Sequence, residues 1–398
     1  MPVIHLFFVT IMIPKSAQIN YIGVNDHDLD LFESQYKIPQ GISYNSYLIL
    51  DEKVAVMDTA DARKQDQWLQ NLEDGLQGRR PDYLVVHHVE PDHAGAIALL
   101  LERYPEIQVV ASSKALQMLP QFFEGLDLSG RSLAVKEGDT LALGRHSLQF
   151  FAAPMVHWPE VMVSYEQTER ILFSADAFGK FGALDIEDED WACEARRYYF
   201  NICGKYGVQV QMLLKKLAGL DILTICPLHG PILSENLPYY LGLYQTWSAY
   251  EVETDGVFIA YASIHGGTAA AAHCLADILR AKGAGKVSLS DLSRDDQAEA
   301  VEDAFRMGRM VLAASSYDAG VFPPMQEFLH HLQAKNFQKR KVAIVENGSW
   351  APSAGRVMKE ALAAMKDIEI VEPTVTIRSR MKKSDLPALE TLAQALLK

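Results

Sequence analysis

The sequence predicts an α/β protein with two domains: a sandwich of helix-covered sheets, followed by a doubly wound parallel sheet. Its 398 residues exceed what one hydrophobic core usually supports. Short β-like apolar runs dominate up to about residue 250, whereas strands and helices alternate regularly after about Asp255. We therefore place a boundary within 250–256 and expect domains over 1–253 and 254–398.

The first domain is predicted from short apolar runs that are interrupted by helical periodicity. The runs predict strands over 44–50, 54–59, 83–88, 107–112, 148–154, 161–166, 171–176 and 222–230. Apolar residues recur at helical spacing near 94–103, 115–124, 205–219 and 235–250. Hairpins followed by flanking helices favour sheets covered by helices, with much antiparallel pairing.

The second domain is predicted from five strand-and-helix repeats. The strands are "GVFIAYAS", "KVSLSDL", "MVLAASS", "KVAIVEN" and "IEIVEP". Helices are expected from Thr268, near 296–306, from Pro324, near 352–365 and from about Ser384. Such a repeat predicts a parallel sheet of strand order 2-1-3-4-5, with a ligand crevice at the carboxyl ends of its strands.

Composition excludes several classes of partner. The formal charge of −14 argues against a general affinity for nucleic acid, so small molecules or basic protein surfaces are expected instead. Four scattered cysteines without a CxxC pair indicate a reducing cytoplasm. The start "MPVIHLFFVTIMIPK" has no basic leader and is too short to span a bilayer, so we expect no membrane role. Translation from Met12 is one interpretation of this start.

Metal-binding side chains recur at predicted strand ends in the first domain. A lone histidine is more often structural than a ligand, and Asp92 alone could cap a helix. Four such side chains within six positions would be costly to bury without a cation, which leaves a buried metal or a solvated loop. Seven ligands suffice for two metals if one carboxylate bridges. The candidates are His88, Glu90, Asp92, His93, His157, Asp176 and His229.

Three loops at one edge of the second domain predict a cofactor site. The first is a strand-to-helix turn whose glycines and hydroxyls suit a phosphate, although any tight turn of this kind favours such residues. Tyr317 and Trp350 would cover the faces of a planar ligand, unless Trp350 only fills a loop. No GxGxxG fingerprint for a nicotinamide cofactor occurs. The candidates are Ser263, Ile264, His265, Gly266, Gly267, Thr268, Ser315, Ser316, Tyr317, Asp318, Ala319, Gly320, Glu346, Asn347, Gly348, Ser349 and Trp350.

The metal motifs resemble those of the metallo-β-lactamase superfamily, an αββα fold whose zinc hydrolases carry HxHxDH. Here Glu90 gives HxExDH, which is similar to flavodiiron proteins, and the extra carboxylate favours iron over zinc. "GISYNSYLIL" and "VMDTAD" extend the resemblance, and the second domain resembles the flavodoxin-like, FMN-binding half of that family. Two positions depart from it. His265 stands where relatives have threonine or tyrosine, and Asp30 where many have histidine, with His27 the nearest.

This resemblance implies a role for each candidate ligand. His88, Glu90 and His157 would hold one iron, Asp92, His93 and His229 would hold the other, and Asp176 would bridge both. Tyr198 or Tyr199 would point into the substrate pocket and donate a hydrogen bond to a bound gas; the alternative is an aromatic core pair on a helix.

The resemblance also implies a reaction. Dioxygen would be reduced to water, nitric oxide to nitrous oxide, or both, with FMN relaying electrons from an external donor such as rubredoxin or reduced deazaflavin. It further implies a head-to-tail homodimer or a dimer of dimers. The alternatives are a zinc-dependent hydrolase with an appended flavodoxin domain, and a non-catalytic flavin electron carrier whose metal site is vacant.

Overall fold

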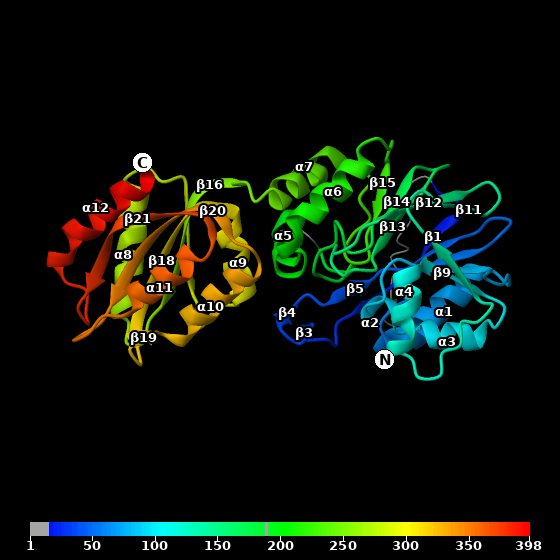
Figure 1. Cartoon of the computed structure of the whole chain (residues 1–398), viewed down its shortest axis with the longest axis horizontal. Helices are drawn as coiled ribbons and strands as arrows, with labels where there is room; N and C mark the ends of the chain where they lie inside the picture. The colour runs from blue at the N-terminus through cyan, green and yellow to red at the C-terminus, as the bar shows by residue number, and fades with distance from the viewer. Residues whose placement is uncertain (1–15, 188–189) are drawn as a thin grey trace, which may run out of the picture. The chain divides into compact units, whose positions relative to one another are not determined.

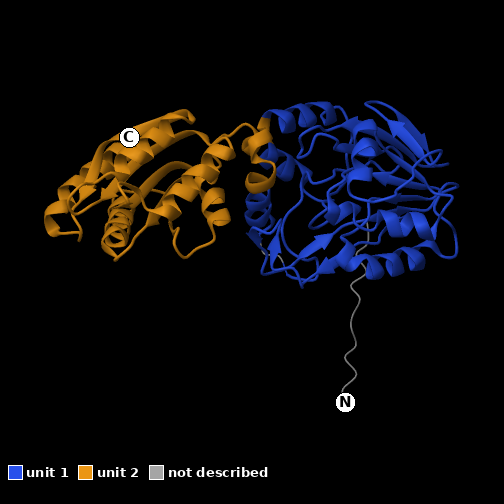
Figure 2. Ribbon diagram, turned by 60° about the horizontal axis from the view of Figure 1, so that its bottom comes forward, with its two compact units in different colours: residues 1–198, 208–244 blue, residues 199–207, 245–398 orange. Residues whose placement is uncertain are grey.

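The computed structural model describes residues 16–187 and 190–398, so the choice between Met1 and Met12 as the first residue lies outside it. The chain divides into two compact units (Figure 2). The first comprises the chain up to Tyr198 together with Val208–Tyr244, and the second comprises Tyr199–Gly207 together with Gln245–Lys398. Among the helices of the described ranges, none combines the length and apolar character needed to cross a lipid bilayer.

The first unit contains two sheets. One has the order β1-β6-β7-β8-β9-β10 and the other β11-β12-β13-β14-β15. Apart from the parallel run β7 to β10 and the pair β14 and β15, neighbouring strands in these sheets are antiparallel. The strands are β1 Ile19–Tyr21, β6 Tyr47–Ile49, β7 Ala55–Met57, β8 Tyr83–Val86, β9 Gln108–Ser112, β10 Ser132–Val135, β11 Thr140–Ala142, β12 Ser147–Ala152, β13 Met162–Glu166, β14 Ile171–Phe173 and β15 Thr224–Cys226.

The inner faces of these two sheets share one core. Its buried members come from both, among them Tyr47 and Val85 of the first sheet and Phe150 and Phe173 of the second. Two small pairs, β2 Val24–Asp26 with β5 Ile42–Tyr44 and β3 Leu31–Phe32 with β4 Tyr36–Lys37, stand apart from the sheets. This confirms the predicted sandwich with much antiparallel pairing.

Helices cover the outer faces of the sandwich. Those after β7, β8 and β9 lie beside the first sheet, and α6 and α7 beside the second (Figure 1). Their bounds are α1 Gln65–Leu76, α2 Pro91–Ala94, α3 Ile97–Arg103, α4 Ser113–Met118, α6 Gly207–Leu217 and α7 Leu237–Ser248. Helix α5, Trp191–Ile202, has residues in both units. Short 3-10 turns are Ala62–Lys64, Leu119–Gln121 and Gly204–Tyr206.

The second unit is built on a parallel sheet of order β17-β16-β18-β20-β21, which confirms the predicted order 2-1-3-4-5. Helices α8 and α12 pack on one face, and α9, α10 and α11 lie on the other (Figure 1). The bounds are β16 Thr254–Ala262, α8 Gly267–Ala281, β17 Lys286–Asp291, α9 Gln297–Arg306, β18 Met307–Tyr317, β19 Gly320–Val321, α10 Pro323–Ala334, β20 Gln338–Asn347, α11 Ala354–Ala363, β21 Lys366–Ile377, a 3-10 turn Lys383–Asp385 and α12 Leu386–Leu397.

A buried ion pair in the first unit is expected to contribute to its stability. Nδ1 of His146 lies 3.0 Å from Oε1 of Glu166, and both side chains are buried. The carboxylate of Glu166 raises the pKa of His146 above its usual value, although burial opposes this. We expect His146→Gln to lower the free energy of unfolding by about 3 kcal/mol near pH 6, because it leaves a buried carboxylate without its cation.

The sign of the pH dependence follows from the raised pKa. The stabilisation by His146 is complete below the unfolded-state pKa and is lost as the pH rises through the folded-state pKa. Urea unfolding of the wild type and His146→Gln should therefore give free energies that converge towards alkaline pH. His27→Gln is the control, because the pair of His27 with Asp185 is about half exposed and contributes little. A His146→Gln deficit that stays constant from pH 6 to pH 9 would contradict this assignment.

Candidate metal centre and flavin site

The first four candidate ligands follow strand β8 and enter a short helix. Glu90 is the N-cap of α2, with extended backbone (φ −60°, ψ 139°), and Pro91 begins the helix. Thr59 anchors the segment, because its backbone N–H and its hydroxyl both donate to the carbonyl of His93, at 2.9 and 2.6 Å. The strand end and the helix turn thus bring His88, Glu90, Asp92 and His93 to one side of the segment.

The other three candidate ligands lie on loops that strand pairing brings together. Asp176 closely follows β14 and His229 closely follows β15, and since these strands are parallel neighbours, their carboxyl ends are adjacent. The loop with His229 is held by Asn45, whose amide donates to the carbonyls of Pro227 and Gly230 at 2.9 and 2.8 Å. His157 lies on the loop between β12 and β13.

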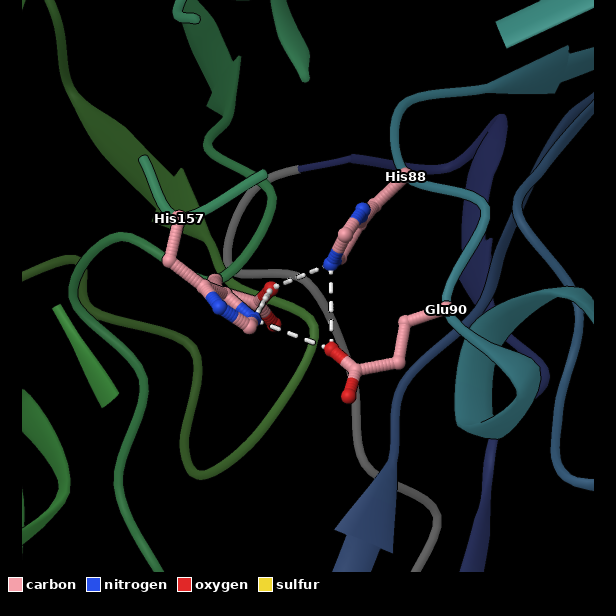
Figure 3. A group of neighbouring side chains, drawn as sticks. His88, Glu90 and His157 are labelled. Carbon is pink, nitrogen blue, oxygen red and sulfur yellow. Dashed lines mark hydrogen bonds and ion pairs between the residues drawn. The ribbon is translucent and has the colours of Figure 1, made fainter. Parts of the chain in front are cut away.

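Four of the seven side chains form a first group around one point (Figure 3). Oε2 of Glu90 lies 3.1 Å from Nε2 of His88 and 2.9 Å from Nε2 of His157. Oδ2 of Asp176 lies 3.3 Å from Nε2 of His88 and 3.6 Å from Nε2 of His157. These spacings suit one cation, since ligand atoms at 2.0–2.2 Å from a metal lie roughly 3.0–3.5 Å apart.

Three further side chains form a second group, and Asp176 faces both. Oδ2 of Asp92 lies 3.3 Å from Nε2 of His93 and 3.2 Å from Nε2 of His229. Oδ1 of Asp176 lies 3.2 Å from Nε2 of His93 and 3.7 Å from Nε2 of His229. One oxygen of Asp176 therefore faces each group. The structure thus brings together all seven predicted ligands.

The chemistry of this cluster fits two cations. Both carboxylate oxygens of Asp92 and of Asp176, together with Nε2 of His93 and of His229, are buried and have no hydrogen-bond partner within the described residues. Buried anionic oxygens without donors are strongly destabilising unless a cation compensates them. A divalent metal in each group would coordinate these atoms.

Two carboxylates of the cluster, those of Glu90 and Asp176, have pKa values below their usual ones, which favours the deprotonated form that metal ligands require. Burial raises the pKa of Glu90, but the adjacent imidazoles of His157 and His88 reverse this and leave the pKa lowered. Burial also raises the pKa of Asp176, yet the charge of the neighbouring His93 brings it well below its usual value.

Outer contacts orient the histidine rings, and the sequence did not reveal them. Nδ1 of His229 lies 2.7 Å from the carbonyl oxygen of Ser43, and Nδ1 of His88 lies 2.6 Å from Oε1 of Glu160. With Nδ1 donating, Nε2 of each ring presents its lone pair to the cluster. The only sequence signal for Glu160 is a carboxylate three positions after His157.

His87, adjacent to the first ligand, is not part of the cluster. Its Nδ1 lies 2.6 Å from Oδ2 of Asp58, and its Nε2 lies 2.8 Å from the hydroxyl of Ser164. Both ring nitrogens are therefore occupied within the protein. The doubled histidine in "VVHHVE" thus contributes one residue to the fold and one to the cluster.

A cavity of about 200 Å³ leads to the cluster. Glu90, Pro91 and Asp92 line it together with residues from three other segments. Leu29, Leu31, Phe32, Glu33 and Ser34 come from the segment before β5, Tyr44 from β5, and Asp61 and Arg63 from the segment after β7. His27 does not line it; its ring pairs with Asp185, 3.0 Å away. On either side of Asp30, Leu29 and Leu31 line this cavity.

The two candidate tyrosines face different surroundings. The ring of Tyr198 lies 5.6 Å from the ring of His229 and 5.0 Å from that of Phe181. The ring of Tyr199 instead lies 5.5 Å from that of Trp247, within the second unit. The structure therefore brings Tyr198 to the edge of the metal cluster and makes Tyr199 part of an aromatic core.

The predicted phosphate loop forms an open turn at the start of α8. Gly266 has a left-handed backbone (φ +82°), and Gly267 begins the helix. The hydroxyl of Ser263 is buried and has no hydrogen-bond partner in the part of the chain that is described. Ile264 and His265 are exposed beside it. An unpaired hydroxyl next to a helix N-terminus fits a phosphate group.

The three loops around this turn are joined by hydrogen bonds. The hydroxyls of Thr268 and Ser315 lie 2.9 Å apart. The amide of Asn347 donates to Thr268 at 3.2 Å and to the carbonyl of Ser379 at 2.9 Å, while its oxygen accepts from the N–H of Ser379 at 3.0 Å. Ser379, after the fifth strand, is a part of this edge that the sequence did not indicate.

The remaining candidates of the flavin site comprise exposed aromatic rings, side chains that are hydrogen-bonded within the fold, and other loop residues. Tyr317 and Trp350 are exposed, Trp350 by 90%, and their rings are available to a planar ligand. The side chains of Ser316 and Glu346 are used within the fold, since their oxygens accept from the backbone N–H groups of Ser353 and Gly355, each at 2.8 Å. Asp318, Ala319, Gly320, Gly348 and Ser349 complete the loops.

Comparisons with known proteins agree with this arrangement. A sequence model of the family described as "ODP family beta lactamase" matches residues 42–230. The chain is 29% identical to "Nitric oxide reductase" of Moorella thermoacetica, over 92% of this chain and 94% of that one. It superimposes on the rubredoxin oxygen:oxidoreductase of Desulfovibrio gigas with a TM-score of 0.89 and 26% identity, over 95% and 96% of the two chains. In sequence and in fold the chain is therefore similar to flavodiiron proteins.

This similarity extends to the cofactor sites but not to the whole architecture of every relative. Flavodiiron proteins carry FMN and a non-haem di-iron centre, and the two ligand groups fit the latter. The chain is also 34% identical to "Putative diflavin flavoprotein A 2" of Synechocystis, over 71% of its own length, but it spans only 50% of that longer relative. Activity, substrates and partners are therefore considered as proposals.

Proposed function

We propose that this flavodiiron protein reduces dioxygen to water, nitric oxide to nitrous oxide, or both, at a di-iron centre supplied with electrons through FMN. The placement of Asp176 carries the proposal, because one carboxylate that faces two groups of ligands suits a pair of metals. The relatives named for nitric oxide reduction and for rubredoxin oxygen oxidoreduction support it.

In this proposal each ligand has a stated position. His88, Glu90 and His157 would hold the first iron, Asp92, His93 and His229 would hold the second, and Asp176 would be shared. When bound, the irons would supply electrons and open positions for a diatomic gas, and FMN would replenish those electrons.

The surrounding residues shape access to the centre. Leu29, Leu31 and Phe32 give the cavity an apolar wall that admits a small neutral gas. Tyr44 also lines the cavity, and its hydroxyl is held in place because it donates to Asp26 at 3.1 Å and accepts from Arg63 at 3.2 Å. We assign Tyr198 to the edge of this site and Tyr199 to the core.

The cofactors are assigned to different parts of the chain. Residues 1–253 form the di-iron domain and residues 254–398 the FMN domain, with the phosphate at Ser263–Thr268 and the ring system beside Tyr317 and Trp350. The electron donor is a separate protein or cofactor, such as rubredoxin or reduced deazaflavin, and the working assembly is a head-to-tail homodimer or a dimer of dimers. A reducing cytoplasm is the expected location, since the four cysteines form no CxxC pair.

Metal and flavin analysis tests this function directly. Protein purified from cells grown with iron should contain about two irons and one FMN per chain, because the carboxylate-rich ligand set favours iron over zinc. Chemically reduced protein should consume dioxygen or nitric oxide under anaerobic control, and comparing the two rates gives the preference. Stoichiometric zinc without iron, together with no consumption of either gas, would contradict the proposal and favour a hydrolase.

A further inference from the structure

His88 is engaged at both of its ring nitrogens. Nε2 faces the first ligand group, 3.1 Å from Oε2 of Glu90 and 3.3 Å from Oδ2 of Asp176, while Nδ1 lies 2.6 Å from Oε1 of Glu160. A neutral imidazole carries one N–H. If Nδ1 donates that hydrogen to the carboxylate, the lone pair of Nε2 is directed to the metal position.

Glu160 is itself held in place. Its side chain is fully buried, its Oε1 accepts from the backbone N–H of Val89 at 3.1 Å, and its carbonyl accepts from the hydroxyl of Ser112 at 2.8 Å. It lies on the same loop as His157, which is a candidate ligand of the same group. One loop thus supplies a ligand and also the residue that orients a second ligand.

The two histidines of the second group have different surroundings behind their rings. Nδ1 of His229 donates to a neutral carbonyl, that of Ser43, and Nδ1 of His93 has no hydrogen-bond partner in residues 16–187 and 190–398. A carboxylate behind a ligating imidazole fixes its tautomer and increases its basicity. His88 therefore differs from His93 and His229 in the charge behind its ring.

We propose that Glu160 is a positioning residue that holds His88 on the first metal position and makes that position electronically different from the second. The inference rests on the proposed function, because it concerns the same centre. It requires no contact between Glu160 and the substrate. Orientation would come from the hydrogen bond, and the electronic difference from the negative charge.

Two substitutions separate these contributions. Glu160→Ala removes the hydrogen bond and the charge, so we expect affinity for the first metal to fall about 10- to 100-fold and the metal content to fall from about two towards one per chain. Glu160→Gln keeps an oxygen acceptor of the same reach but removes the charge. We expect it to retain both metals, with an altered spectrum of one of them.

The measurement is a titration of the metal-depleted full chain with Co²⁺ against a chelator, followed by visible absorption, together with Mössbauer spectra of the iron-loaded protein. The control is Glu166→Ala, which removes a buried carboxylate paired with His146 away from the cluster. It should lower stability and leave both metal affinities unchanged. Circular dichroism checks that each variant is folded.

The outcomes separate this inference from the proposed function. Wild-type cobalt affinity and an unchanged spectrum in Glu160→Ala would overturn the role of Glu160. If Glu160→Ala does not fold, the spectrum of Glu160→Gln decides, and an unchanged spectrum overturns the electronic inequivalence. If the wild type takes up cobalt but neither binds iron nor reduces a gas, the proposed function fails while the cobalt titration still tests Glu160.

Discussion

Replacing Asp176 by asparagine is expected to remove iron from at least one of the two positions and to lower the rate of gas reduction more than about a hundredfold. This loss exceeds the one expected when only a supporting residue is changed. Oδ2 of Asp176 faces His88 and His157, and Oδ1 faces His93 and His229. Asparagine supplies one neutral oxygen and places an amide N–H₂ where the second oxygen was. One of the two metals would then meet a hydrogen-bond donor.

Elemental analysis and anaerobic turnover with each gas measure this effect. Asp221→Asn is the matched control, because Asp221 is 71% exposed and pairs with Arg170 at the surface. It should retain about two irons and the wild-type rate. Two irons and an undiminished rate in Asp176→Asn would show that the carboxylate is not shared.

Replacing Gly267 by alanine is expected to lower FMN affinity by at least about tenfold, because an added methyl group strains a packed site. A tenfold loss corresponds to about 1.4 kcal/mol of binding free energy. A Cβ at this position would lie 2.1 Å from the carbonyl oxygen of Ser379 and 3.1 Å from the side-chain nitrogen of Asn347. The first contact is with backbone, so the start of α8 or the loop with Ser379 must move. That movement separates the loops that form the phosphate turn.

Fluorescence titration of the flavin-depleted protein with FMN gives the affinity, and iron content serves as an internal check. Gly219→Ala is the control, because a Cβ there has no heavy atom within 4 Å. Gly267→Ala should keep its iron, since Gly267 belongs to the second unit. An unchanged affinity for FMN would exclude this turn as the phosphate site.

The second unit was predictable from the sequence because each of its elements is locally encoded. Strands such as β16 and β20 contain continuous apolar runs, residues 257–262 and 342–345, and the helices between them carry apolar residues at helical spacing. Once five such repeats are recognised, the handedness of strand crossovers leaves few possible sheet orders. Among these orders, the resemblance of the second domain to flavodoxin favours 2-1-3-4-5.

The first unit was less predictable because much of it depends on distant partners. Strands β1 to β5 and β10 to β11 have at most four residues, too few for a periodic pattern, and form by pairing with other segments. Helix α1 is absent from the prediction although Trp68, Leu72 and Leu76 are buried at a spacing of four. Polar residues dominate the rest of that helix and obscure its apolar stripe.

The candidate ligands could be selected from the sequence because histidine and carboxylate side chains cluster in one loop and recur at strand ends. Their supporting residues could not. Glu160 and Ser43 are ordinary residues in the sequence, and only the folding of distant loops places them behind His88 and His229. For the same reason, the sequence could not choose between Tyr198 and Tyr199, which are adjacent on one helix but face different units.

The wide spacing of the ligands along the chain has a consequence for biosynthesis. The first ligand is residue 88 and the last is residue 229, and the loop with His229 is anchored by Asn45 from near the start of the described chain. A nascent chain that has not yet emerged beyond this loop lacks His229, one ligand of the second group. It also lacks the hydrogen bonds between Asn45 and the loop that carries His229. Stable loading of both irons must therefore wait until the ribosome has released most of the first unit.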